Sequence, residues 1–133
     1  MSPELTCNKQ VTADRVCANG DVGGAVGTYP LALMCHQHQI PFYVVVQTTA
    51  IDVSCPTGKL MMNEDKGGND VRSIGGAQVV PQGVKVVNPA FDITPAEFVS
   101  AVVTEEGVCT APYDKSFRTI VEKARERVVA AAS

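Results

Sequence analysis

The run Phe42-Tyr43-Val44-Val45-Val46 constrains the fold of this chain more than any other stretch. It is apolar or aromatic at every position, so both faces of an extended chain would be apolar, and Pro41 stands just before it. A strand with one face in water alternates apolar and polar residues, whereas a strand covered on both faces does not. The run therefore predicts a central strand of a sheet that helices cover on both sides.

Two helices are expected around this strand. The first runs from Val26 to His38, with Pro30 in its first turn, where the missing N–H costs little. The second runs from about Asp114 to Ala131, with apolar residues on one face and a charged face that we expect to be solvated. Strands that alternate with helices predict an α/β protein with a Rossmann-like three-layer fold and a mainly parallel sheet.

The remaining elements are less sharply marked. We predict strands at 11–18, 60–62 and 84–87, where β-branched or apolar residues cluster between turn signals. Thr94-Pro95-Ala96-Glu97 has the form of a capping box with Pro at the first helical position. This motif predicts a helix from Pro95 to about Thr104 that ends at Gly107.

Length and composition limit the classes of protein to consider. A chain of 133 residues is expected to form one domain, here 11–133, preceded by a polar segment 1–10 that is disordered unless a partner holds it. The net charge of -3 argues against a nucleic-acid surface, and no apolar run or signal pattern indicates a membrane. We expect a cytoplasmic protein.

The cysteines and histidines give no sign of a metal site. Five cysteines are scattered without a Cys-x-x-Cys pair, which disfavours a disulfide framework and structural zinc and favours small reduced core residues. His36 and His38 have no carboxylate or cysteine in register and are expected at the surface or helix end. No metal and no cofactor are predicted.

Two polar strings carry the candidate chemistry. Residues 14–21 lie at the first predicted strand and residues 88–92 follow a later one, and ligands of α/β sheets lie beyond the carboxyl ends of strands. The two strings would border one pocket if their strands are neighbours, and an apolar wall beside Asp14 would favour its acid form. The alternative is that Asp14, Asp21 and Asp92 cap loops and helix N-termini.

A glycine-rich stretch precedes the first predicted helix. Gly23, Gly24 and Gly27 could let backbone N–H groups at the helix start cradle a phosphate. The stretch lacks a full Gly-x-Gly-x-x-Gly after an apolar strand and also lacks the Gly-Lys-Ser/Thr of a P-loop. It is therefore a weak signal for a nucleotide.

Several literal strings of the sequence point to a known family. They are Ala13-Asp14-Arg15, Asn19-Gly20-Asp21, Gly27-Thr28-Tyr29, Ile40-Pro41-Phe42-Tyr43-Val44, Ile51-Asp52, the segment from Asn88 to Pro95, and Thr104-Glu105-Glu106-Gly107. In their order and spacing they resemble the 5-methylthioribose-1-phosphate isomerases, over about residues 11–109. These enzymes share a superfamily with ribose-1,5-bisphosphate isomerases and the regulatory subunits of translation initiation factor 2B.

The resemblance implies aldose-to-ketose isomerisation of a sugar 1-phosphate in methionine salvage. The phosphate on C1 prevents spontaneous ring opening, so an enzyme must labilise the ring and move hydrogen from C2 to C1. The family's catalytic acid falls on Asp14, and desolvation is expected to keep such an acid protonated. The substrate-binding residues that we assign are Asn19, Asp21, Gly27, Asn88 and Asp92.

The chain departs from the family in two ways. The family's chain is longer, and its helical N-terminal domain, catalytic cysteine and arginine-bearing phosphate loop have no counterpart in this sequence. Gly24 and Ala25 stand where the family has an Asn-Lys pair that contacts substrate. One catalytic group and a charge-assisted contact to the phosphate are therefore missing, so we predict no turnover by the isolated chain.

Three functions remain open after this comparison. The chain is an isomerase domain that works with an N-terminal half supplied elsewhere, a non-catalytic structural or interaction subunit of a larger assembly, or a regulatory fragment related to the initiation-factor subunits. The partners expected are a sugar-phosphate substrate if the domain is active, and a second copy or a complementing protein. A homodimer or such a complex would cover the sheet edge and apolar surface that the shorter chain leaves.

Overall fold

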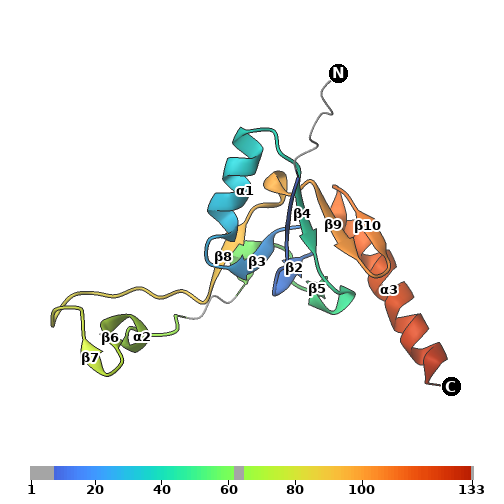
Figure 1. Cartoon of the computed structure of the whole chain (residues 1–133). Helices are drawn as coiled ribbons and strands as arrows, with labels where there is room; N and C mark the ends of the chain where they lie inside the picture. Colours follow the sequence, from blue (N-terminus) through green and yellow to red (C-terminus); the bar gives the residue numbers. More distant parts are fainter. Residues whose placement is uncertain (1–7, 62–64, 133) are drawn as a thin grey trace.

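The computed structural model describes residues 8–61 and 65–132 (Figure 1). The elements of these residues, in chain order, are β1 (Lys9–Val11), β2 (Arg15–Cys17), β3 (Val22–Ala25), α1 (Thr28–Gln37), β4 (Phe42–Val45), the 3₁₀ turn η1 (Thr48–Ala50), β5 (Ile51–Asp52), η2 (Gly58–Leu60), α2 (Asn69–Arg72), β6 (Ser73–Ile74), β7 (Ala77–Gln78), β8 (Phe91–Thr94), η3 (Ala96–Phe98), β9 (Ala101–Thr104), β10 (Gly107–Cys109) and α3 (Tyr113–Ala131).

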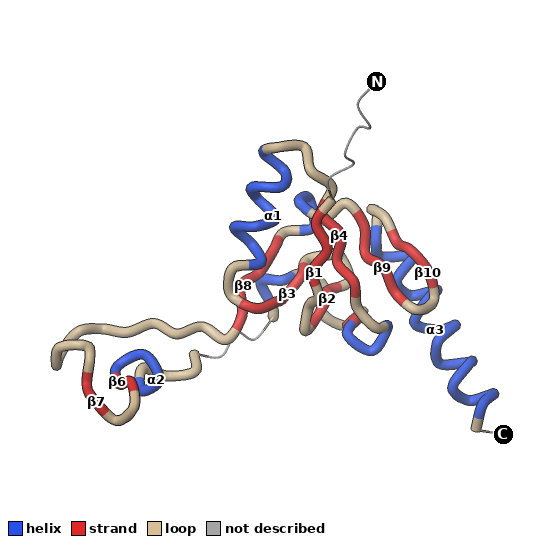
Figure 2. Tube along the Cα trace, viewed as in Figure 1, coloured by secondary structure: helices blue, strands red, loops and turns tan. Residues whose placement is uncertain are grey.

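The predicted central strand is confirmed as β4, in a sheet of order β1-β4-β9-β10 (Figure 2). β4 is parallel to both neighbours, with Val44 opposite Val11 on one side and Val102 on the other. β10 is the edge strand of the sheet and pairs antiparallel with β9. The α/β class is confirmed, but the expectation that helices cover β4 on both faces is wrong: Phe42, Val44 and Val46 are buried on one face, whereas on the other Val45 is 42% exposed.

A second sheet of order β5-β2-β3-β8 was not expected. Only β2 and β5 run parallel in it, so the mainly parallel arrangement holds for the first sheet alone. The single strand predicted at 11–18 is therefore wrong, because β1 and β2 belong to different sheets. The chain crosses between them at residues 12–14, where the Asp14 N–H already bonds to the Gly23 carbonyl of the second sheet at 3.0 Å.

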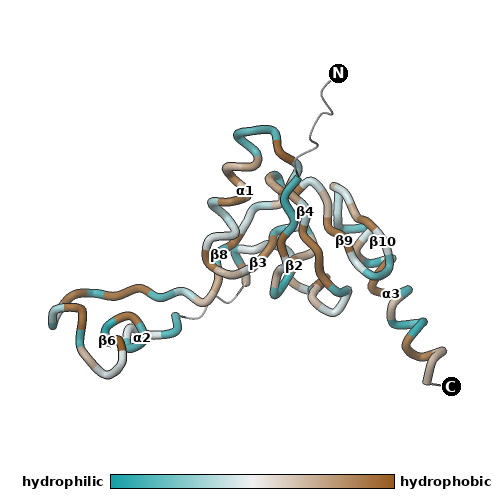
Figure 3. Tube along the Cα trace, in the orientation of Figure 1, coloured by the Kyte–Doolittle hydropathy of each residue, from teal (hydrophilic) through white to brown (hydrophobic). Residues whose placement is uncertain are grey.

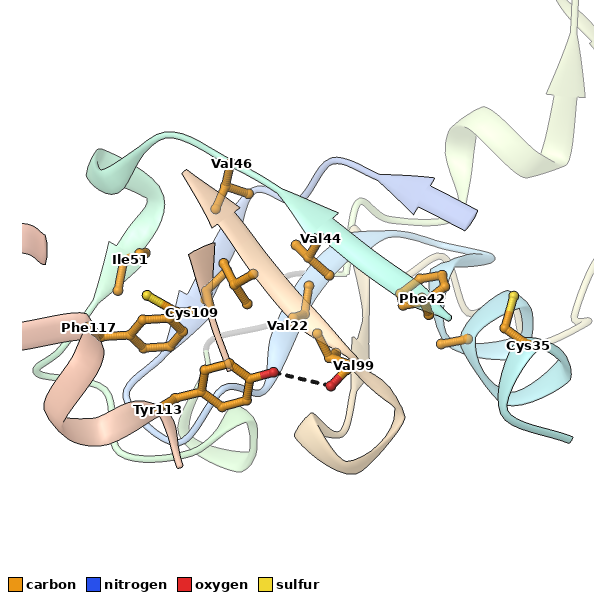
Figure 4. Packing of buried hydrophobic residues seen from close by; sticks show 13 residues of the cluster. Val22, Cys35, Phe42, Val44, Val46, Ile51, Val99, Cys109, Tyr113 and Phe117 are labelled. Carbon is orange, nitrogen blue, oxygen red and sulfur yellow. Dashed lines mark hydrogen bonds between the residues drawn. The ribbon is translucent and has the colours of Figure 1, made fainter. Parts of the chain in front are cut away.

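Small aliphatic side chains and two stacked rings make the core (Figure 4). Val44 and Val102 lie opposite each other on β4 and β9 of the first sheet, and both are fully buried. The rings of Tyr113 and Phe117 stack at 5.0 Å, and the Tyr113 hydroxyl donates to the Val99 carbonyl at 3.1 Å. Burial raises the pKa of the Tyr113 hydroxyl. The start of α3 is thus attached to the loop before β9.

Both predicted long helices are present, with one correction to the surface of α3. Polar and apolar segments alternate along this helix (Figure 3), which buries Phe117 while its far end is exposed. The charged face is not simply solvated. Lys123 Nζ lies 3.5 Å from Oε2 of Glu106, and Arg127 Nη2 lies 2.9 Å from Oε1 of this almost buried carboxylate. The ion pairs hold the outer half of α3 against the β9–β10 turn.

The helix predicted from Pro95 to Thr104 is wrong. The chain makes the short turn η3 and then enters β9, where Ala101 and Val102 are buried beside β4. The Thr94 hydroxyl does not cap a helix, and it is buried with no hydrogen-bond partner in the part of the chain described. Burial of β-branched residues in a central strand has overridden a local capping signal, as tertiary packing often does.

Residues 65–89 form an arm that projects from the body (Figure 1). The Lys66 N–H donates to the Asn88 carbonyl at 2.8 Å and closes the base of the arm. The strand predicted at 84–87 is wrong, because this segment is unpaired and Val84 and Val87 are exposed. We predicted a strand at 60–62, but Leu60 ends the turn η2 instead. Met62 lies outside the described residues.

Candidate functional site

Asp14 lies where the chain leaves β1 and crosses to the second sheet. The residue is exposed, so the described residues do not desolvate it as we expected. Among the described residues its carboxylate has no hydrogen bond or ion pair. It lines a small cavity of about 130 Å³ with Gly23, Met61 and Phe91, and a wider one of about 340 Å³ that reaches Asp52. Its oxygens are free to contact a ligand.

A larger groove of about 650 Å³ opens at the carboxyl ends of β1, β4 and β9. Thr12 and Ala13, just before Asp14, line it, together with Gln47 after β4 and Glu105 after β9. Ligands of α/β proteins bind at this edge, because the polar loops that follow parallel strands gather there. The groove and Asp14 therefore lie at the same edge of the first sheet.

Glu105 is the polar residue of this groove that the sequence analysis did not single out. Both its oxygens accept from the Thr48 N–H at 3.1 and 3.0 Å, and the Thr48 hydroxyl donates to Oε1 at 2.5 Å. The Thr48 hydroxyl bond holds the pKa of Glu105 below its ordinary value. The string Thr104-Glu105-Glu106-Gly107 carried the signal, but we had placed it at a helix end instead of in a β-hairpin turn.

Asn19 and Asp21 brace the loops and do not face a cavity that contains Asp14. Asn19 Oδ1 accepts from the Asp21 N–H at 3.0 Å. The two carboxylate oxygens of Asp21 accept from the N–H groups of Gly58 and Ala96, each at 2.9 Å. Burial raises the pKa of Asp21, but the hydrogen bonds from Asn19, Gly58 and Ala96 outweigh it and lower the pKa. Asp21 supplies the cap of η3 that Thr94 was expected to supply for a helix.

Gly27 and Asp92 are brought together at the start of α1. Asp92 Oδ2 accepts from the N–H groups of Gly27 at 2.7 Å and Tyr29 at 3.1 Å. Gly27 has a φ of 110°, which favours glycine. The carboxylate thus occupies the end of the helix where we expected a phosphate, because a side-chain anion there satisfies the same N–H groups and the helix dipole.

Asn88 holds the base of the arm and lies apart from Asp14. Its Nδ2 donates to the Gly67 carbonyl at 3.1 Å, and its N–H donates to Asp65 Oδ1 at 3.3 Å. On β8, Phe91 faces the cavity of Asp14, whereas the next side chain, Asp92, faces the opposite way, as alternation along a strand requires. The cavities that Asp14 lines contain neither Asn88 nor Asp92, so the single pocket that we expected does not form there.

Arg15 and Asp52 form the other charged contact beside Asp14. Arg15 Nη1 lies 3.9 Å from Asp52 Oδ2, across the pairing of β2 with β5. Asp52 Oδ1 accepts from the Ser54 hydroxyl at 2.5 Å and from the Ser54 N–H at 3.0 Å. The Ser54 hydroxyl bond lowers the pKa of Asp52. Residues 8–61 and 65–132 contain no cluster of three or more His, Cys, Asp or Glu side chains that could hold a metal ion.

The sequence matches the model of the initiation factor 2 subunit family over residues 10–111, which is most of the chain. The chain belongs to this family. Within the residues that the structure describes, no helix has the length and apolar character needed to cross a membrane.

The relatives and solved structures that the chain resembles come from both branches of this family. The methylthioribose-1-phosphate isomerase of Koribacter versatilis is 46% identical over 84% of this chain and 32% of its own length. The isomerase of the same name from Thermosipho africanus is 47% identical over 85% of this chain and 33% of its own length. The chain spans about a third of the length of these curated relatives.

Two crystal structures of the family match the fold. That of 5-methylthioribose 1-phosphate isomerase from Pyrococcus horikoshii OT3 has a TM-score of 0.79 and 35% identity, over 87% of this chain and 32% of that one. That of translation initiation factor eIF-2B subunit delta from A. fulgidus has a TM-score of 0.77 and 35% identity, over 86% of this chain and 33% of that one. The fold is therefore that of the initiation factor 2 subunit family, and it does not separate the two branches.

Proposed function

We propose that this chain supplies the Asp14-bearing part of a methylthioribose-1-phosphate isomerase site and that it does not turn over substrate alone. The observation that carries the proposal is the carboxylate of Asp14, which has no partner within the described residues and is exposed between two cavities at the carboxyl edge of β1. The identity of 42–47% to proteins named methylthioribose-1-phosphate isomerase supports it.

The proposed role of Asp14 is acid catalysis on the sugar. A sugar that carries phosphate on C1 cannot open its ring spontaneously, so a proton donor must act on the ring before hydrogen moves from C2 to C1. Asp14 is the acid of the site in this proposal. None of the four described cysteines takes the place of the cysteine that the resemblance gives as its counterpart, because Cys17, Cys35 and Cys109 are buried and Cys55 lies against Cys17.

The test is complementation. The N-terminal part of a full-length relative, for example that of the Thermosipho africanus isomerase, is added to this chain, and ketose formation from methylthioribose 1-phosphate is followed. We expect no turnover by the chain alone, turnover by the mixture, and loss of that turnover in Asp14→Asn. Ketose formation by the chain alone at an enzymatic rate, or full activity of the Asp14→Asn mixture, would contradict the proposal.

Gly24 and Ala25, which stand where the family has an Asn-Lys pair, offer a second test of the same proposal. Ala25 is exposed beside the start of α1, so Ala25→Lys adds a cation there without displacing core atoms. A Cβ at Gly24 would lie 3.1 Å from Thr28 Oγ1, so an Asn there requires the Thr28 side chain to shift. We expect Ala25→Lys to tighten binding of methylthioribose 1-phosphate about tenfold, the effect of one charge-assisted contact, with Ala25→Gln as the uncharged control. Equal affinities of these two variants would argue against a phosphate near this position.

The alternative function is a non-catalytic interaction subunit, and the arm favours it. Four apolar side chains of the arm, Ile74, Val79, Val84 and Val87, are 46–70% exposed, and exposed apolar side chains that gather in one region mark interaction surfaces. The proposed cover is a second copy or the complementing protein. Purification from the chain's own cells distinguishes the readings: an isomerase fragment supports the first, whereas initiation-factor subunits or another assembly support a regulatory or structural role.

A further inference from the structure

Two cysteines that are far apart in the sequence meet at the carboxyl end of β2. Cys17 Sγ and Cys55 Sγ are 3.2 Å apart. Cys17 is the last residue of β2 and is completely buried, whereas Cys55 is partly exposed in the loop after β5. The other described cysteines, Cys35 on α1 and Cys109 on β10, are buried.

The backbone holds these two sulfur atoms face to face. β2 pairs with β5, so that Cys17 lies opposite Asp52. One residue farther on, the Ala18 N–H donates to the Cys55 carbonyl at 2.9 Å, and beyond it Asp21 binds the Gly58 N–H. Asp52 also fixes the loop from within, because its Oδ1 accepts from the Cys55 N–H at 3.2 Å. Two fixed backbones therefore present two thiols that need to approach by only about 1 Å to reach bonding distance.

We propose that Cys17 and Cys55 form a redox-active dithiol, which a peroxide oxidises to an intramolecular disulfide. The inference does not depend on the isomerase proposal, since it rests on the sulfur contact and the backbone around it. A structural core cysteine would be expected among apolar neighbours, as Cys35 is, and not against a second, partly exposed thiol.

The different surroundings of the two thiols set the order of the steps. Cys55 is the thiol that solvent reaches, so its thiolate attacks one peroxide oxygen, the O–O bond breaks, and hydroxide leaves as Cys55 sulfenic acid forms. Burial, with further contributions from Cys55, raises the pKa of the Cys17 thiol to about 12, so Cys17 is not the first to react. Cys17 sulfur then bonds to the Cys55 sulfur, and its proton leaves with the sulfenic hydroxyl as water.

Atoms and electrons balance in this reaction when peroxide is the oxidant. Two thiols and one hydrogen peroxide give one disulfide and two waters, so the sulfur atoms lose the two electrons that the peroxide oxygens gain. The bond would tie the end of β2 to the loop 53–57. Val53 and Ser54 of this loop, and Asp52 just before it, line the 340 Å³ cavity beside Asp14, so oxidation would fix one wall of that cavity.

The experiment titrates the full chain with hydrogen peroxide under native conditions, blocks free thiols by alkylation, and maps peptides by mass spectrometry. We expect a peptide pair joined through Cys17 and Cys55, lacking the two thiol hydrogens, while Cys35 and Cys109 are found unmodified until the protein is unfolded. Closing a loop of this length should raise the Tm by roughly 5–10 °C over the reduced protein. Dithiothreitol should reverse both changes.

Cys55→Ala is the test variant, and Cys35→Ala is the matched control. Cys55 is only partly buried, so its replacement leaves the core intact. We expect the peroxide-dependent rise in Tm to vanish in Cys55→Ala and to persist in Cys35→Ala. Alkylation of both Cys17 and Cys55 after peroxide, sulfinic acid at Cys55 without the joined peptides, or joined peptides that mainly involve Cys7, Cys35 or Cys109 would each overturn the proposal.

Discussion

Asp14 and Asp21 stand seven positions apart in one polar string, yet they have opposite surroundings. Asp21 is half-buried, and each of its carboxylate oxygens accepts a backbone N–H from a distant segment. Asp14 is exposed, and its carboxylate has no partner within the described residues. The same residue type thus joins three segments in one place and faces open cavities in the other.

This contrast separates structural from available carboxylates throughout the candidate site. Glu105 resembles Asp21, because both of its oxygens accept from another part of the chain, whereas Asp92 accepts through Oδ2 alone and its Oδ1 is buried with no hydrogen-bond partner among the described residues. The hydrogen bonds that Asp21 and Glu105 accept lower the pKa of both carboxyl groups, so neither can donate a proton without losing these contacts. Of the acidic site residues assigned from the sequence, Asp14 is the one whose oxygens remain open to a substrate.

The largest expected effect on stability is that of Asp21→Ala. The substitution leaves the N–H groups of Gly58 and Ala96 without their acceptors and separates η2 and η3 from the turn after β2. Two hydrogen bonds to a charged group, partly screened by solvent, correspond to a loss of about 3 kcal/mol in the free energy of unfolding. Urea unfolding measures it. A loss below about 1 kcal/mol would show that the hydrogen bonds of Asp21 do not make it more important for stability than Asp14.

The pH dependence of Asp21 provides an independent check of the same contact. Its pKa is lowered in the folded protein, so its contribution to stability is present above the unfolded pKa near 4 and is lost as the pH falls through the lower folded value. We therefore expect the difference in unfolding free energy between wild type and Asp21→Asn to shrink below about pH 4. A constant difference from pH 7 to pH 2 would contradict the assignment.

Glu105→Ala should have the next largest effect. Glu105 accepts from both the N–H and the hydroxyl of Thr48, but it is more exposed than Asp21, so solvent replaces part of what is lost. We expect a loss of about 2 kcal/mol in urea unfolding. Glu122→Ala, on the exposed face of α3, is the matched control and should change stability by less than about 0.5 kcal/mol. Equal losses of stability in the two variants would show that the Glu105 carboxylate does not stabilise the fold as Asp21 does.

Asp92→Ala should cost less, about 1 kcal/mol, the usual value of a helix N-terminal cap. The reason is that water can reach the start of α1 at Gly27 and Tyr29, both of which are exposed. Asp92→Asn is the control, because its amide oxygen still accepts from both N–H groups. A larger loss in Asp92→Asn than in Asp92→Ala would show that the cap is not the main role of this side chain.

The sequence predicted the elements whose apolar residues form a continuous or periodic pattern, because such a pattern reports burial. β4 was predicted from its uninterrupted apolar run, and α1 and α3 were predicted from apolar residues that recur with the period of a helix. The sequence did not reveal β9, since the local capping signal at Thr94 competes with a strand that becomes favourable only beside β4. The split of 11–18 between two sheets is hidden for the same reason, because Val11 and Val16 are equally β-branched and differ only in their partners.

The candidate site was predictable in its residues but not in their grouping. The polar strings identified Asp14, Asp21 and Asp92, and the structural alternative considered for all three describes the latter two. Which oxygens are free depends on contacts across more than sixty positions, such as that between Gly27 and Asp92, and a local pattern does not encode them. Glu105 was overlooked because its partner, Thr48, lies 57 positions away in the sequence.

Asp14→Asn should have the smallest effect on stability and the largest effect on function. With no partner for its carboxylate among the described residues, the substitution is expected to change the free energy of unfolding by less than about 0.5 kcal/mol. Its backbone N–H bond to the Gly23 carbonyl is unaffected, so the crossing between the sheets is kept. The ordering of the four variants in urea unfolding tests the contrast as a whole. A loss at Asp14 as large as that at Asp21→Ala would mean that Asp14 too is a brace, and the isomerase proposal would then lose its acid.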